Sequence, residues 1–317
     1  ITTAAPDATA SQGSDRDAVT IRVGSLKGPT SLGLLNLMDK SSKGETVDNY
    51  EFQMATGADE LLPLVVKGDL DIVLVPANVA AVLYQKTDGG VEVIDINTLG
   101  VLYLLTGTAE ISSVEDLKGK TVYLTGKGTT PEASLRYLLD AAGLKEEEVN
   151  LEFKSEAAEV AAVLSENPDA IGLLPQPFVT AACMQNESLK IVLDINEEWM
   201  RLQSETGDGN GMVTGVTVVR KAFLQESPEA VETFLEEHAG SAAAINEDPV
   251  AGASLAVEAG IVAKEPIALK AIPQCNIVCI TGEEMKEALS GYLKVLNDFN
   301  AELTGGAMPG DDFYHIP

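Results

Sequence analysis

Residues 70–86, LDIVLVPANVAAVLYQK, contain the pattern that decides the fold of this chain. The nearly unbroken apolar run at 70–75 is typical of a strand buried on both faces of a sheet, since a half-exposed strand would alternate apolar and polar residues. The segment 77–86 predicts a helix, and Pro76-Ala77-Asn78 joins the two. A strand followed directly by a helix is the repeating unit of α/β proteins.

The same alternation extends in both directions from this unit. Further strands are expected at 19–26, 49–54, 91–96, 99–106, 121–125, 149–154, 170–174, 190–195 and 212–219. Further helices are expected at 29–40, 58–67, 131–142, 157–165 and 178–185, with mostly helical structure from 220 to 300. Roughly ten strands alternating with helices indicate a parallel-sheet α/β architecture, and two sheets suit the length better than one.

Length and charge limit the classes of function. The chain has 317 residues, which suggests two domains of about 150 residues each. It carries 21 Lys and Arg against 49 Asp and Glu, a net charge of −28. Such a surface repels phosphate, which excludes a nucleic-acid partner and disfavours docking on anionic lipid. A hydrophobic content of 45% excludes an intrinsically disordered chain.

The N-terminal residues 1–18 are mostly Ala, Thr, Ser, Gly and Asp and have no apolar periodicity. They predict a flexible linker of the kind that follows a removed leader. The longest uncharged apolar stretch, 72–84, has thirteen residues, whereas a membrane-spanning helix needs about twenty. We therefore expect an extracytoplasmic spacer and no transmembrane helix.

The cysteines and histidines predict neither a disulfide framework nor a metal centre. Cys183, Cys275 and Cys279 are odd in number and contain no C-x-x-C pair. We expect all three to be small buried residues. His238 and His315 are the two histidines, and no His, Cys and carboxylate group has the spacing of a metal site. No metal and no cofactor are expected.

Polar loops follow five of the predicted strands. In open α/β sheets, ligands bind beyond the carboxyl ends of the strands, where helix N-termini offer free N–H groups. The candidate ligand-binding residues in these loops are Lys27, Gly28, Thr30, Ser31, Thr56, Gly57, Pro76, Ala77, Asn78, Lys127, Gly128, Thr129, Thr130, Pro175 and Gln176. They suit a small ligand with acceptor or anionic groups.

These features also have plain structural interpretations. Thr129 with Glu132, and Ser112 with Glu115, fit capping boxes at helix starts. Trp199 and Tyr103 could stack on a ligand ring, although packing in the core is the commoner role for such side chains.

The sequence matches none of the common nucleotide-binding, calcium-binding or hydrolase motifs. The run GKGTT at 126–130 is neither a P-loop nor a dinucleotide fingerprint, and DGNG at 208–211 lacks the other ligands of a calcium loop. No G-x-S-x-G is present, and two histidines do not support Ser/His/Asp catalysis. No catalytic residue is predicted.

Several stretches resemble one known family. VEDLKGKTV at 114–122, LTGKGTTPE at 124–132 and LLDAAGL at 138–144 are similar to the second-lobe core of extracytoplasmic solute-binding proteins of ABC importers. Within these the likeness is to the nitrate/sulfonate/taurine and thiamine-pyrimidine (NMT1/THI5-like) group. LLPQPFVT at 173–180 resembles that group's PEPF turn, with Gln176 where Glu is frequent. VTVVRKAF at 216–223 and SPEA at 227–230 resemble its return strand and C-terminal helix.

The resemblance implies a type II periplasmic-binding-protein fold, in which two α/β lobes hold a ligand between them. One lobe would comprise 19–104 plus 214–317 and the other 105–213, with hinge crossovers near Leu105 and Val213. The implied function is capture of a small molecule and its delivery to an ABC importer permease. The implied form is a monomer, either a cell-surface lipoprotein or a periplasmic protein.

The ligand and two other functions stay open. An oxyanion or sulfonate would need cations, and Lys27 and Lys127 are the only candidates in the loops, so a pyrimidine-like heteroaromatic ligand is equally supported. An enzyme on the same fold, such as a menaquinone-pathway dehydratase or a pyrimidine synthase, needs an acid or base in the cleft. Asp59 and Glu132 are the nearest carboxylates. A ligand-sensing module is the third alternative.

Overall fold

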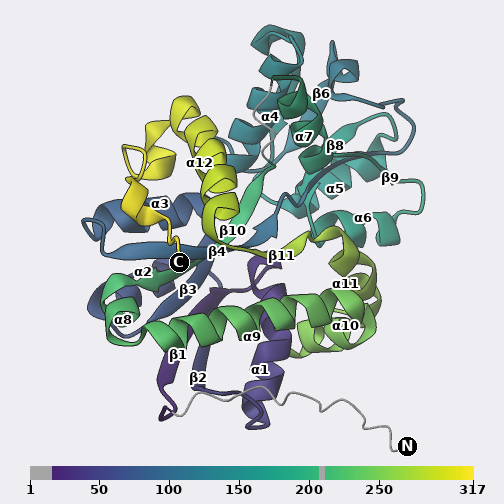
Figure 1. Cartoon of the computed structure of the whole chain (residues 1–317). Coiled ribbons are helices and arrows are strands. Elements are labelled where there is room, and N and C mark those ends of the chain that lie inside the picture. The colour runs from purple at the N-terminus through teal and green to yellow at the C-terminus, as the bar shows by residue number, and fades with distance from the viewer. Residues whose placement is uncertain (1–15, 207–210) are drawn as a thin grey trace, which may run out of the picture.

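Two β-sheets organise the described residues, 16–206 and 211–317 of a computed structural model (Figure 1). Most of the predicted linker, 1–15, and most of the DGNG stretch lie outside the described residues. The first sheet has the strand order β11-β4-β10-β3-β1-β2. Its strands are β1 (Thr20–Leu26), β2 (Asn49–Ala55), β3 (Ile72–Pro76), β4 (Val91–Leu99), β10 (Val213–Arg220) and β11 (Ile277–Ile280). The second sheet has the order β7-β6-β8-β5-β9. Its strands are β5 (Leu102–Thr106), β6 (Thr121–Leu124), β7 (Asn150–Phe153), β8 (Ile171–Pro175) and β9 (Lys190–Asp194).

Both sheets are mixed, which corrects the expectation of parallel sheets. In the first, β1 pairs in parallel with β2 and β3, but β10 runs antiparallel to β3 and β4. In the second, β6 pairs in parallel with β7 and β8, but β5 runs antiparallel to β8 and β9. A parallel pair needs a crossover helix over its own sheet. β5 and β10 instead enter their sheets directly from the other sheet.

Helices cover both faces of the first sheet (Figure 1). Those that accompany it are α1 (Leu35–Ser42), α2 (Ala58–Lys67), α3 (Ala77–Lys86), α8 (Lys221–Glu226), α9 (Pro228–Glu247), α10 (Pro249–Glu258), α11 (Glu265–Ala271) and α12 (Gly282–Phe299). On one face Leu37 of α1 and Phe234 of α9 share a core cluster, and on the other Leu83 of α3 packs in a cluster with Leu289 of α12. The second sheet carries α4 (Thr130–Ala141), α5 (Ala157–Glu166), α6 (Phe178–Gln185) and α7 (Ile195–Thr206).

The chain changes sheet twice. It leaves the first sheet after Leu99 and enters the second at Leu102, before the crossover expected near Leu105. It returns between α7 and Val213. The division into lobes at 19–104 plus 214–317 and 105–213 remains a proposal. The loops that follow β3, β6 and β8 lie near these crossings, which is why residues of both sheets meet there.

Several local expectations needed correction. α7 and β11 were not predicted as separate elements, and the segment expected to be helical from 29 begins as a 3₁₀ turn, Pro29–Leu34, before α1. The capping box expected at Ser112 and Glu115 lies one residue later. The 3₁₀ turn there starts at Val114, so Asp116 occupies the third position and its carboxylate accepts from the N–H groups of Ser112 and Ser113.

The described end of the predicted linker is attached to the first sheet. Arg16 donates two hydrogen bonds to the buried carboxylate of Asp48, at 2.7 and 2.5 Å. Within 16–206 and 211–317, every helix is too short or too polar to cross a bilayer.

Candidate functional site

A cavity of about 180 Å³ lies where the two sheets meet. The first sheet contributes the start of α3 (Pro76, Ala77 and Asn78) and the crossing residues Met212, Val213 and Thr214. The second contributes Thr125 and the start of α4 (Thr130 and Pro131), and Tyr292 of α12 completes the wall. The first N–H groups of a helix have no partner within the helix. Two helices that begin at one cavity therefore offer it backbone donors from both sheets.

Besides the Tyr292 phenol, four polar side chains line this cavity: Asn78, Thr125, Thr130 and Thr214. Across the described residues none of the four has a side-chain hydrogen-bond partner, although neighbouring polar groups in the same loops do. Polar groups at a partly enclosed surface are normally paired by protein or water. These four are therefore available to a bound molecule.

The rest of the wall of this cavity is apolar and uncharged. Leu102, Leu173, Pro175 and Val213 are among its lining residues, and none of the described residues in this wall is Asp, Glu, Lys, Arg or His. Tyr292 donates to or accepts from Ser134 of α4 at 3.3 Å. Burial raises the pKa of Tyr292 to about 12, so it lines the cavity as a neutral phenol.

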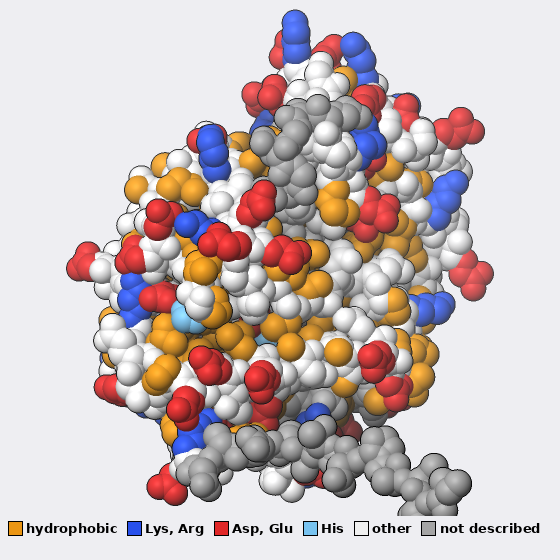
Figure 2. Space-filling model, viewed as in Figure 1, with side chains coloured by type: hydrophobic (Ala, Val, Ile, Leu, Met, Phe, Trp, Pro, Cys, Tyr) orange, Lys and Arg blue, Asp and Glu red, His pale blue; other side chains and the backbone are white. Residues whose placement is uncertain are grey.

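A second, wider cavity of about 460 Å³ shares Val101, Pro175 and Thr214 with the first. Its wall is mostly apolar and includes Pro29, Phe178, Ile261, Val262 and Ile267. Lys27 is the one charged residue in that wall. Acidic side chains are spread over the face of the molecule that Figure 2 shows, but none of the described ones lines either cavity.

Gln176 joins the two sheets beside these cavities. Its amide nitrogen donates to Oε1 of Gln274 at 2.9 Å, and its oxygen accepts from the Thr180 hydroxyl at 2.8 Å. The Tyr103 hydroxyl donates to the carbonyl oxygen of Gln274. Gln176 stands where the resembling family often has Glu. Its neutral side chain links the start of α6 to Gln274.

The structure divides the candidate residues into two sets. Eight line one of the two cavities or both: Lys27, Gly28, Pro76, Ala77, Asn78, Thr130, Pro175 and Gln176. Thr214, which was not among the candidates, lines both and lies next to Val213, the expected hinge residue. Seven do not: Thr30, Ser31, Thr56, Gly57, Lys127, Gly128 and Thr129.

The second set has structural contacts instead. Thr30 and Ser31 are buried, and the Ser31 hydroxyl donates to the Leu26 carbonyl. Thr56 donates to Glu60, which also caps the N–H of Gly57. Lys127 is exposed, 5.8 Å from the Phe153 ring centroid.

The loop of Gly128 and Thr129 corrects another expectation. Thr129 does not cap α4 with its side chain, since its hydroxyl donates back to Gly126, while Glu132 accepts from the N–H of Gly128. The Glu132 carboxylate is also held by Arg136. This carboxylate is thus engaged within its own helix start.

The two aromatic candidates belong to the core. Trp199 and Tyr103 are buried. Trp199 lies between Tyr137, at a ring-centroid distance of 4.5 Å, and Tyr292, at 5.6 Å. Trp199 is not among the residues that line the first cavity, but it contacts the ring of Tyr292, which is.

Sequence reasoning missed Tyr292 and the apolar wall at 261–263. Both come from the helical C-terminal region, where the alternating pattern of the sheets no longer signals strand ends. Tyr292 lies in the middle of α12 on its buried face, and nothing in its local sequence separates a cavity wall from ordinary core.

The tertiary structure brings together one group of His, Cys and carboxylate side chains that no spacing in the sequence indicated. Asp95, His238 and Cys279 lie together, with one ligand atom from each within 4.8 Å of the others. Asp95 and His238 are 143 residues apart in sequence, so no spacing motif could reveal the group.

Comparisons with known proteins give one family and one fold. A family model described as NMT1/THI5 like matches residues 88–251, just over half of the chain. No curated protein sequence matches. A solved ABC transporter structure from Parabacteroides distasonis is 23% identical, with a TM-score of 0.76 over 95% of this chain and 99% of that one.

Two further solved structures are more distant in sequence. The periplasmic aliphatic sulphonate binding protein of Escherichia coli is 14% identical, with a TM-score of 0.71 over 94% of this chain and 92% of that one. The periplasmic nitrate-binding protein of Synechocystis PCC 6803 is 13% identical, with a TM-score of 0.58 over 90% and 85%. The chain has the fold of these periplasmic binding proteins, as the sequence resemblance predicted.

Proposed function

Since the chain belongs to the NMT1/THI5-like family, we propose that it is an extracytoplasmic solute-binding protein that captures a small molecule between its two sheets and delivers it to the permease of an ABC importer. Its structural relatives include transporter binding proteins for a sulphonate and for nitrate. We further propose that it acts as a monomer, either free outside the cytoplasmic membrane or attached there through a lipid anchor.

One observation carries the proposal: α3 and α4, which belong to different sheets, both begin at the same cavity. A molecule in that cavity would contact Asn78 from one side and Thr130 from the other. Its binding would therefore favour arrangements in which the two sheets stay close, which is how a hinged binding protein couples ligand to shape.

The lining favours a neutral ligand over a strongly charged one. Transfer of an anion out of water requires paired charges or several charged hydrogen bonds. No described residue in the wall of the first cavity is a cation, and Lys27 lies in the wall of the wider cavity. We propose a flat, weakly polar heteroaromatic molecule with hydrogen-bond acceptors facing Asn78 and Thr130. An oxyanion or sulfonate, bound by the two helix N-termini and Lys27, is the second candidate.

An enzyme of the same fold is less well supported. General acid–base or nucleophilic catalysis needs a titratable group near the reacting atoms. Among the described residues, the walls of the two cavities contain no Asp, Glu, His or Cys, and their titratable lining residues are Lys27 and Tyr292. Binding without chemistry needs only the polar and apolar contacts present.

A ligand screen tests the function. The full chain would be melted in the presence of sulfonates, nitrate and other oxyanions, pyrimidines, other vitamin precursors and amino acids. A ligand at about a thousand times its dissociation constant adds about 4 kcal/mol of stability, which is a shift of several degrees. Intrinsic fluorescence gives a second readout, since Trp199 is the only tryptophan and contacts Tyr292 of the cavity wall.

A single pyrimidine-like hit with both signals supports the proposed ligand class, and a sulfonate or oxyanion hit supports the second candidate. Mass spectrometry of the denatured protein would detect a ligand that copurifies. Turnover of a bound compound into a released product would contradict the binding-protein function.

A further inference from the structure

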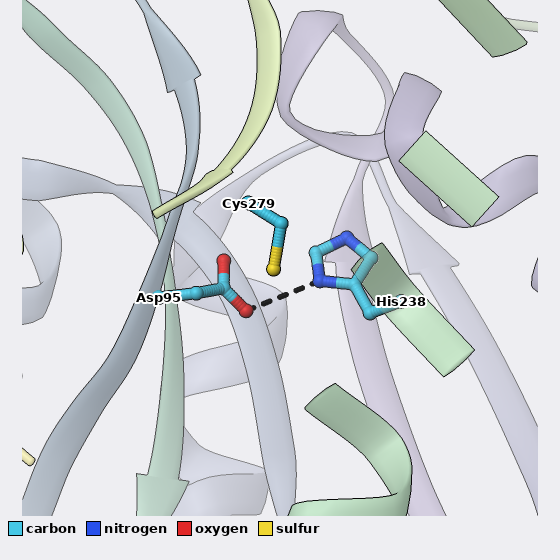
Figure 3. A group of neighbouring side chains, drawn as sticks. All are labelled: Asp95, His238 and Cys279. Atoms are coloured by element: carbon cyan, nitrogen blue, oxygen red, sulfur yellow. Dashed lines mark hydrogen bonds and ion pairs between the residues drawn. The ribbon is translucent and has the colours of Figure 1, made fainter. Parts of the chain in front are cut away.

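Three side chains from distant parts of the chain lie together between the first sheet and α9 (Figure 3). Asp95 comes from β4, His238 from α9 and Cys279 from β11. Nδ1 of His238 lies 3.1 Å from Oδ2 of Asp95, and the Cys279 sulfur points toward the same space. The three donor atoms are a carboxylate oxygen, an imidazole nitrogen and a sulfur, all within 4.8 Å of one another.

The burial of the group is unusual for such polar side chains. Asp95 and His238 are both 0% exposed, and Cys279 is partly exposed. Buried Asp and His need strong partners, because each loses its hydration on folding. Asp95 accepts from the Thr217 hydroxyl at 2.9 Å through its other oxygen, so its Oδ1 is oriented by β10 while Oδ2 faces the group.

Irregular strand pairing directs these side chains to one point. Between the pairs Ile277–Thr98 and Ile280–Ile96, β11 advances by one residue more than β4. In regular pairing Cys279 would lie opposite Ile96 and on the other face from Asp95. The extra residue turns Cys279 to the face of Asp95, and the pairing of β4 with β10 also shifts on both sides of the Asp95–Thr217 pair. Bulges commonly re-aim side chains at functional sites.

We propose that Asp95, His238 and Cys279 bind one divalent cation of the Zn²⁺ type, at a site separate from the ligand cavities. Carboxylate, imidazole and thiolate together suit a borderline metal ion and do not suit Mg²⁺ or Ca²⁺, which take oxygen ligands. Bonds of about 2.0–2.3 Å in a tetrahedron place donors roughly 3.3–3.8 Å apart. The Asp95 and His238 atoms already lie that close, and a small rotation of Cys279 completes the set. The fourth position takes water.

Metal binding would change the protonation of His238 and Cys279. The metal replaces the hydrogen bond between Asp95 and Nδ1 of His238, and the imidazole proton moves to Nε2. Nε2 is buried without a hydrogen-bond partner in the described structure, beside Gly33. The Cys279 thiol loses its proton to solvent and binds as thiolate. One proton is therefore released for each ion bound.

A reactive cysteine is the competing interpretation of the same group. A nucleophilic cysteine needs a lowered pKa. Burial and the nearby Asp95 carboxylate instead raise the pKa of the Cys279 thiol. A metal ion removes that obstacle because its charge stabilises the thiolate, whereas a nucleophile would have to ionise beside a carboxylate.

Titration of the metal-free full chain with Co²⁺ tests the proposal. Co²⁺ bound to thiolate gives a near-ultraviolet charge-transfer absorption band that carboxylate and imidazole sites lack. We expect about one Co²⁺ per chain with this band, displacement by Zn²⁺, and a rise in melting temperature with either ion. Cys279→Ser should abolish the band and weaken Zn²⁺ binding at least about tenfold.

The matched control is Cys183→Ser, which changes a partly buried cysteine on the second sheet's α6 and should keep the band. Refolding from denaturant in the presence of Co²⁺ removes any barrier to reaching the buried site. Absence of the band in the wild type after refolding, or its persistence in Cys279→Ser, would overturn the proposal. Neither result bears on the ligand cavities, whose screen uses organic and oxyanion ligands.

Discussion

Of two adjacent threonines, Thr129 and Thr130, only the second lines the first cavity. Thr130 is the first residue of α4 and lines the first cavity without a side-chain partner in the described structure, whereas the Thr129 hydroxyl is used by the carbonyl of Gly126. Both threonines look alike in the sequence GKGTT. Their difference follows from the turn at Gly126, which bends the Thr129 side chain back onto the loop.

Thr130→Ala should weaken binding of the ligand identified by the screen by about 1–3 kcal/mol, since a buried hydrogen bond to the ligand is lost. Thr129→Ala, one residue away, is the control and should leave the affinity unchanged. Calorimetric titration of both variants measures this. Equal losses in both, or none in either, would remove the start of α4 from the site.

Asp71 illustrates a residue whose effect depends on pH. It is buried where β1 and β10 flank β3, and both Arg22 and Arg220 donate to its Oδ1, at 2.7 and 2.6 Å. Burial alone would raise the pKa of Asp71, but hydrogen bonds from Arg22 and Arg220 outweigh it and hold the pKa below the ordinary value of 3.8. The ionised carboxylate is thus favoured by folding.

Asp71→Asn should destabilise the protein at pH 7 by about 1.5–3 kcal/mol, the range for hydrogen bonds to charged groups. A lowered folded-state pKa contributes stability that is present above pH 4 and is lost as pH falls further. The difference in unfolding free energy between wild type and Asp71→Asn should therefore be smaller at pH 3 than at pH 7. Urea unfolding at both pH values measures it, with the exposed Asp69→Asn as control. A difference that stays constant with pH would contradict the assignment.

At the scale of elements, β10 has to fit closely between its neighbours. Gly215 of β10 faces Asn97 of β4 and Thr30 of the 3₁₀ turn, and a Cβ at Gly215 would overlap both side chains. Gly215 therefore lets the candidate loop after β1 pack onto the sheet beside the return crossing. Gly240, on the exposed side of α9, has nothing within 4 Å of an added Cβ.

Gly215→Ala should destabilise the fold by about 1–3 kcal/mol through overpacking. Gly240→Ala, the same substitution in an open helical position, should be neutral or stabilise by roughly 0.5–1 kcal/mol because Ala favours helix. Chemical unfolding of the two variants distinguishes them. A neutral Gly215→Ala would mean that β10 and the 3₁₀ turn are not in tight contact.

At the scale of the whole molecule, hydrogen bonds between residues that accompany the first sheet and residues that accompany the second lie on two sides of the ligand cavities. Ser134 meets Tyr292 on one side, and Gln176 meets Gln274 on the other. A ligand that spans the cavity would add to these contacts. These contacts must break if the two sheets are to move apart. A bound ligand would add contacts across the cavity and so favour the closed arrangement.

Small-angle scattering should therefore show a smaller radius of gyration with the ligand than without it. Gln274→Ala removes the side-chain contact with Gln176 and keeps the bond from the Tyr103 hydroxyl to the backbone carbonyl; it should still shift the ligand-free chain toward the larger form. An unchanged radius on saturation with a tightly bound ligand would refute closure, while leaving binding itself untouched.

Much of the fold was predictable from local patterns. The strand and helix at 70–86 lie where the apolar run and the helical segment predicted them, and α6 has the bounds that the sequence indicated. This unit could be predicted because a strand buried on both faces gives an unbroken apolar run, which differs from the pattern of the helix that follows it. α7 and β11 carried too little pattern of their own, since β11 is four residues long and irregularly paired.

The sequence by itself determined the elements, the family resemblance and the polar strand ends, because these depend on neighbouring residues along the chain. Only the tertiary structure decided which of those loops meet at a cavity. It brings Asn78 and Thr130 together and leaves Thr56 and Lys127 outside. It also joins Asp95, His238 and Cys279 across long stretches of chain. The order and direction of strands set such contacts, and these follow from how the whole chain buries its apolar faces rather than from any local pattern.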